Sequence, residues 1–166
     1  MVDWITFGVQ WLHVLLGIVW FGNTLALAIF FIPALSRLSI TTQREIGARL
    51  GERATPIIDV VAPAILVLGV IRGTLLGPID SVEEVFTTAY GLTWLLALVV
   101  TVGVFLWGRI VIVGAVNRLA AAPLTADGGP TPEMEAALSR AKQVTVLELV
   151  GFFVIFTCMI LMRFGL

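Results

Sequence analysis

Long apolar runs separated by short polar segments make up most of the 166-residue chain. They fall in four regions: Trp4–Leu35, Pro56–Leu76, Val85–Asn117 and Thr131–Arg163. A helix needs about 20 predominantly apolar residues to cross a bilayer, and each region contains such a stretch. The pattern therefore predicts one all-α domain over residues 1–166, an integral membrane four-helix bundle.

The polar segments predict how these helices are joined. Thr42 followed by Glu45 is typical of a capping box, which predicts a short amphipathic helix on the membrane surface within Ser36–Ala54. An extension of a neighbouring span is the alternative. Pro63 predicts a kink in the second span. Loops are expected at Ile79–Glu84 and Ala120–Pro132.

Basic residues are distributed unequally between the two ends of the predicted bundle. One end has only Arg72 and Arg163, near the helix ends. The segments at the other end carry Arg37, Arg44, Arg49, Arg53, Arg118, Arg140 and Lys142. Because cytoplasmic segments are enriched in Lys and Arg, we expect both termini to lie outside.

Composition narrows the class of protein. A hydrophobic content of 59% excludes an ordinary soluble domain. The single cysteine, Cys158, excludes an intramolecular disulfide and a Cys–Cys metal cluster within one chain. The basic residues are too few and dispersed for nucleic-acid binding, so the partner we expect first is membrane lipid.

The first apolar run carries the only histidine of the chain, His13. In hydrocarbon an imidazole needs a partner, a ligand or a water-lined cavity. The helical period places Gly17, Trp20 and Thr24 on about the same face as His13. We expect Gly17, which lacks a side chain, to leave room beside the imidazole for something flat, such as a metal tetrapyrrole.

Arg72 and Arg163 are predicted at the membrane depth of His13, with no acidic residue of the spans at that depth. Two cations beside a histidine favour an anionic ligand. Haem b fits, because its iron binds imidazole and its propionates bind arginines. Two alternatives stay open. The arginines could reach lipid headgroups while His13 bonds a carbonyl, or Arg72 could pair with the acidic loop Ile79–Glu84.

The inner half of the predicted bundle contains Asp59, Arg109 and Glu148. We expect Arg109 to pair with Glu148 or with Asp59, because an unpaired charge in hydrocarbon costs about 3 kcal/mol. Such a pair would fix the register of the helices. A proton path through Glu148 is the alternative.

The end of the last run offers soft sulfur ligands in Cys158, Met159 and Met162, which suit Cu(I). Core packing is the alternative, since methionine is common in apolar helices. Met159 or Met162 could also be a second axial ligand to a haem.

The segment LHVLLGIVWFG, with an early histidine followed by W-F-G, resembles the first helix of bacterial membrane proteins of the copper-resistance protein D type. The pattern is also similar to the HemJ-type membrane protoporphyrinogen oxidase and to the membrane portion of the bacterial urate oxidase with a cytochrome-like tail. The segments VLGVIRGTLLGPI, YGLTWLLALVV and LMRFG resemble this wider group too. The resemblance implies a four-helix unit of the bacterial plasma membrane, with haem b in the HemJ-type branch and copper handling in the copper-resistance branch.

The resemblance also implies that His13 is a haem ligand. The HemJ-type branch has a histidine and a lysine in its third helix. Aligned on Trp94, this chain has Leu96 and Leu98 at those positions. The resemblance therefore does not extend to protoporphyrinogen oxidation or to a haem held by two histidines of one subunit.

These observations predict an integral membrane haem b-binding protein with redox or gas-ligand chemistry at a His-ligated iron, which includes the chemistry of a haem-dependent oxidoreductase. The predicted metal ligands are His13 and Met159, and the predicted cofactor contacts are His13, Arg72, Arg163, Gly17, Trp20 and Trp94, with Phe21 as a further candidate for the pocket wall. A copper-handling membrane protein and a cofactor-free structural subunit of a membrane complex are the alternatives. A homo-oligomer and a separate redox partner both stay open.

Overall fold

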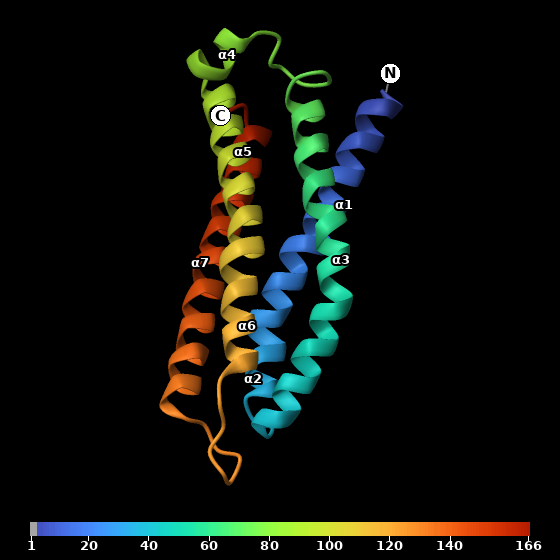
Figure 1. Cartoon of the computed structure of the whole chain (residues 1–166). Helices are drawn as coiled ribbons and strands as arrows, with labels where there is room; N and C mark the ends of the chain where they lie inside the picture. Colours follow the sequence, from blue (N-terminus) through green and yellow to red (C-terminus); the bar gives the residue numbers. More distant parts are fainter. Residues whose placement is uncertain (1–2) are drawn as a thin grey trace.

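A computed structural model describes residues 3–166 as an elongated bundle of long helices (Figure 1). Four helical spans are each long and apolar enough to cross a membrane: Trp4–Leu35, Ile40–Gly73, Ala89–Ala121 and Pro132–Arg163. The predicted all-α four-helix architecture is confirmed, and the chain has the make-up of a multi-pass membrane protein.

Several of these spans consist of more than one helical element. In chain order the elements are α1 (Trp4–Ala26), η1 (Leu27–Phe31), α2 (Ile32–Leu35), α3 (Ile40–Gly73), α4 (Val82–Thr87), α5 (Ala89–Trp107), η2 (Gly108–Ile112), α6 (Val113–Ala121) and α7 (Pro132–Arg163). The elements η1 and η2 have the wider π-helical turn, which occurs mostly as short insertions in α-helices. Each π turn continues directly into the α-helix that follows it.

The segment after the first span does not form a separate surface helix. The N-cap of α3 is Ser39, whose side chain accepts a hydrogen bond from the backbone N–H of Thr42 at 3.3 Å. The predicted capping box of Thr42 and Glu45 is therefore wrong, because Thr42 already lies inside the helix. Glu45 instead pairs with Arg49 one turn later, at 2.7 Å. The alternative, an extension of a span, is the observed structure.

Two further points concern the second span and a loop. α3 begins at Ile40, well before the predicted start at Pro56, and it continues through Pro63, where the kink stays a prediction. The predicted loop Ile79–Glu84 contains the start of α4. Here Ser81 and Glu84 form a capping box, each side chain bonding the other residue's backbone N–H.

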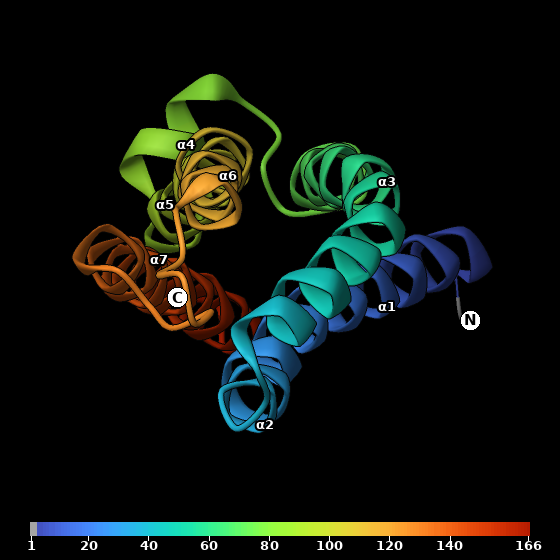
Figure 2. The ribbon, with the colours of Figure 1, turned by 60° about the horizontal axis from the view of Figure 1, so that its bottom comes forward.

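The spans are arranged as two antiparallel pairs. α1 packs against α3 and α5 packs against α7, whereas the two pairs contact each other less (Figure 2). Both termini lie at one end of the bundle, and the α6–α7 loop and the start of α3 lie at the other (Figure 1). The basic segments are therefore at the end opposite the termini, as the sequence predicts.

An aromatic cluster joins the two pairs midway along the bundle. It is named after its two buried aromatic residues, Trp20 and Phe152. Its other buried members are aliphatic: Val61, Ala62, Ile65 and Val104. The Trp20 ring packs edge-on against Phe152 and Phe105, with ring centroids 5.1 and 6.4 Å apart. This packing brings α1 of the first pair against α5 and α7 of the second.

Candidate functional site

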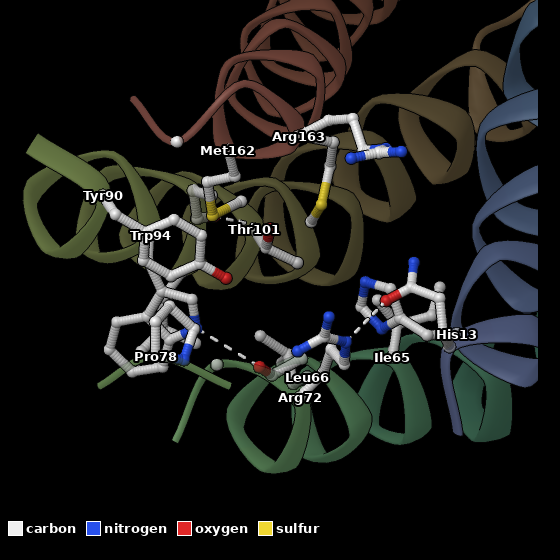
Figure 3. A pocket seen from close by; sticks show the side chains of 17 residues that line it. His13, Ile65, Leu66, Arg72, Pro78, Tyr90, Trp94, Thr101, Met162 and Arg163 are labelled. Carbon is white, nitrogen blue, oxygen red and sulfur yellow. Dashed lines mark hydrogen bonds between the residues drawn. The ribbon is translucent and has the colours of Figure 1, made fainter. Parts of the chain in front are cut away.

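A cavity of about 600 Å³ lies between the two helix pairs, toward the end that holds the termini. All four spans line it: α1 with His13, α3 with Arg72, α5 with Trp94, and α7 with Met159 and Arg163 (Figure 3). Its volume is in the range of small-molecule and cofactor sites. Five residues predicted from sequence thus meet around one space, although they come from four different helices.

The other predicted pocket residues lie elsewhere. Trp20 belongs to the aromatic cluster, and Phe21 stacks on Phe152 with ring centroids 5.4 Å apart. Neither residue lines the cavity. A Cβ added to Gly17 would meet no atom within 4 Å, so Gly17 does not make room for the imidazole.

The imidazole of His13 is almost completely buried, with 7% of the residue exposed. With Trp20 and Thr24 it forms the buried stripe of α1 that the helical period predicts. Its Cε1 edge faces α3, where a Cβ on Gly69 would lie only 3.2 Å away. Gly69, rather than Gly17, is thus the residue that admits the ring.

The Nδ1 atom of His13 is buried and makes no hydrogen bond of good geometry among residues 3–166, but the Ile65 backbone lies close enough to interact with the imidazole. Leaving such an atom unsatisfied costs about 1–3 kcal/mol. Buried polar atoms in native proteins nearly always have partners, so the imidazole is either held by this backbone or available to a ligand in the cavity that His13 lines.

The Arg72 guanidinium is held without an acidic partner. Its Nε donates to Gln10 Oε1 at 3.0 Å (Figure 3). Its Nη1 donates to the Leu76 carbonyl at 2.8 Å. Within the described part of the chain, the ion pairs involve neither Arg72 nor Arg163. Arg72 therefore does not pair with the acidic loop that follows α3, and neither arginine has an acidic partner among residues 3–166.

Trp94 crosses from α5 to α3 at the side of the cavity. Its Nε1 donates to the Gly69 carbonyl at 3.2 Å (Figure 3). A Cβ on Gly73 would lie 2.0 Å from that same Nε1, so the indole rests on the bare backbone of Gly73. The pair Gly69 and Gly73 thus admits a side chain from α1 and another from α5. Their G-x-x-x-G spacing is the sequence signal that could have identified this contact.

Other lining residues were not predicted from sequence. Gln10, the only tyrosine Tyr90, and Thr101 line the cavity. Figure 3 shows the Tyr90 hydroxyl directed into the space between α3 and α7. Thr101 is turned back on its own helix, since its hydroxyl donates to the Ala97 carbonyl at 2.6 Å. A polar residue within an apolar run was the available signal for each of the three.

The sulfur atoms of the α7 end divide into two groups. Met159 and Met162 line the cavity. Cys158 is buried but does not line it, so the three sulfur residues do not form one donor set. No group of three or more His, Cys, Asp or Glu residues within 3–166 is placed to hold a metal ion.

The inner charged residues form one ion pair. Arg109 of η2 bonds Asp59 of α3 at 2.8 Å, which links the two helix pairs. Of the two partners predicted for Arg109, the structure shows Asp59 and not Glu148.

Comparisons with known proteins find no match: no family model fits the chain, and no curated protein or solved structure is matched.

Proposed function

We propose that this protein binds haem b in the membrane, with His13 as the iron ligand. The observation that supports the proposal is a nearly buried imidazole that lines a cavity of about 600 Å³ and whose Nδ1 makes no well-formed hydrogen bond. A histidine-ligated tetrapyrrole needs a single imidazole, whereas a metal ion bound by protein alone needs several ligands.

The remaining donors suit the periphery of such a group. Arg72 and Arg163 would bind the two propionates, because carboxylates are the natural partners of guanidinium groups left without an acid. Gln10 already orients Arg72 through its hydrogen bond. Met159, whose thioether is a known axial ligand type, would approach from α7.

Bound haem would supply an iron that exchanges electrons or binds a diatomic gas. The residues of the chain would hold it between the two helix pairs, and the apolar lining of Ile65, Leu66 and Leu98 would limit water around it. Leu98 lines the cavity at the position where the HemJ-type branch has a lysine, so this position contributes an apolar rather than a basic side chain. We further propose that the chain lies in a bacterial plasma membrane with both termini outside, as a relative of the copper-resistance protein D and HemJ-type proteins.

The test is an ultraviolet–visible spectrum of the detergent-purified protein, oxidised and reduced, with a pyridine haemochrome assay. We expect a Soret band and near-stoichiometric haem in the wild type, and loss of haem in His13→Ala. Arg72→Ala should bind haem more weakly without changing the iron ligand. Arg118→Ala, which removes an exposed arginine at the other end, is the matched control and should bind like the wild type.

The proposal fails if His13→Ala retains full haem occupancy, or if the wild type, produced with haem precursor, shows no Soret band. A folded His13→Ala protein is expected, because one imidazole contributes little to helix packing, and circular dichroism checks this point.

Copper handling is the second candidate, and one observation favours it. His13, Met159 and Met162 line the same cavity, and an imidazole with two thioethers is a soft donor set that suits Cu(I). Metal analysis of colourless purified protein separates the two proposals. Copper bound by the wild type and lost in Met162→Leu would favour this candidate, whereas haem binding by Met162→Leu would favour the first.

A further inference from the structure

Glu148 is an acidic residue in the apolar part of α7, and it does not line the cavity. At 1.5 Å per residue it lies roughly 22 Å along the helix from Arg163, beyond the aromatic cluster and away from the cavity. Its side chain lies against η2, because a Cβ on Gly108 would be 3.3 Å from Glu148 Oε1. A glycine at position 108 is thus what leaves room for the carboxyl group.

The charged groups near Glu148 do not form an ion pair with its carboxyl group. The adjacent cation, Arg109 of η2, is bonded to Asp59 of α3 at 2.8 Å. The first span, which also contacts α7, carries no acidic or basic residue over 4–35 except His13. Further along, α6 has Arg118 and α7 has Arg140 and Lys142, all toward the inner end.

Within residues 3–166, neither ion pair involves Glu148. An unpaired carboxylate inside hydrocarbon costs about 3 kcal/mol, whereas the neutral acid avoids most of that penalty. The π-helical turn next to it is a second, independent feature, since such turns are frequent at functional sites.

We propose that Glu148 is a proton-binding site that holds its proton inside the membrane and exchanges it with the aqueous side nearest the Arg109–Asp59 pair. The side chains of this pair are 45% and 39% exposed at the surface of the bundle, and Arg109 directly follows Gly108, against which the Glu148 carboxyl group lies. The proposal does not depend on haem, because the aromatic cluster separates Glu148 from the cavity.

The test is modification by dicyclohexylcarbodiimide, an apolar reagent that reacts with protonated carboxyl groups in membranes. The carboxyl oxygen bonds to the carbodiimide carbon while the acid proton moves to nitrogen, and the adduct rearranges to a stable N-acylurea. Peptide mass spectrometry on the intact protein in lipid should find the adduct on Glu148, with labelling that falls as pH rises. Glu45, exposed and paired with Arg49, is the internal control and should remain unlabelled.

A second measurement does not depend on a covalent reagent. Infrared spectra at neutral pH should contain the carbonyl stretch of a protonated carboxylic acid, and Glu148→Gln should remove it. The proposal is overturned if Glu148 is unlabelled at acidic pH, if labelling is independent of pH, or if the band persists in a folded Glu148→Gln protein. The mapping of labelled wild-type peptides decides the question even if the variant does not fold.

Discussion

Replacing Gly73 with alanine should weaken the contact between α3 and α5. A Cβ at this position would lie 2.0 Å from Trp94 Nε1, 2.6 Å from Cδ1 and 2.7 Å from Cε2. Three ring atoms at these distances require the indole to move as a whole. That movement would also break the hydrogen bond from Trp94 Nε1 to the Gly69 carbonyl, now 3.2 Å long.

The size of the effect follows from three contributions to the free energy of unfolding. Overpacking a well-packed contact costs about 1–3 kcal/mol. Loss of the indole hydrogen bond costs about 1 kcal/mol more. Alanine is a better helix former than glycine by about 1 kcal/mol, which offsets part of this loss. We therefore expect Gly73→Ala to destabilise the protein by about 1–3 kcal/mol.

The assay is denaturant unfolding of the detergent-solubilised protein, followed by circular dichroism. Gly17→Ala is the control, because a Cβ at Gly17 meets no atom within 4 Å, and it should be neutral or slightly stabilising. In a Trp94→Ala background, Gly73→Ala should no longer be destabilising, which a double-mutant cycle measures as a coupling energy. Equal costs of Gly73→Ala with and without the indole would refute the reasoning.

Two further predictions concern the same helix. Gly69→Ala places a Cβ 3.2 Å from His13 Cε1, so the ring must shift by a few tenths of an ångström. If His13 binds haem, the absorption spectrum or haem content should change in Gly69→Ala and not in Gly17→Ala, and identical spectra would contradict the role assigned to Gly69. Asp59→Asn should leave Arg109 unpaired and lower the unfolding free energy by about 1–3 kcal/mol, a value reduced for the partial exposure of the pair. In denaturant unfolding, addition of Arg109→Gln should restore part of that loss, and a simple sum of two costs would argue against the pair.

Hydropathy predicts the spans because a bilayer requires length and apolarity, and both are properties of the sequence alone. It does not predict where each helix starts. Thr42 and Glu45 have the spacing of a capping box, yet Ser39 caps α3, because its side chain accepts a hydrogen bond from the backbone N–H of Thr42. Pro56 likewise marks the expected start of the second span, although α3 begins at Ile40 and continues through this proline.

The convergence of the site residues was predictable from membrane depth. His13, Arg72 and Arg163 lie at similar distances from the same end, so they line one cavity even though they are far apart in sequence. Depth does not show what each face of a helix packs against. Trp20 lies on the same face of α1 as His13, two turns further along, but its side chain packs against Phe152 and does not line the cavity.

The residues that admit His13 were missed for a related reason. A helical wheel compares residues of one helix, and it therefore suggested Gly17, one turn from the imidazole. The space is instead provided by Gly69 on another helix. The G-x-x-x-G spacing marks Gly69 and Gly73 as a face for close helix contact, but the sequence does not say which side chains of the other helices meet it.

The division into two helix pairs has a consequence for biogenesis. Most contacts of each helix are with the other helix of its own antiparallel pair. We therefore expect each pair to insert into the bilayer and pack as a helical hairpin before the two pairs associate. The last step is then the docking of the pairs around the Trp20–Phe152 contact and the Trp94–Gly69 hydrogen bond. A ligand that touches both pairs favours the docked state by mass action. If the proposed haem binds between the pairs, a shortage of haem should therefore leave more of the newly inserted chain undocked and open to proteolysis.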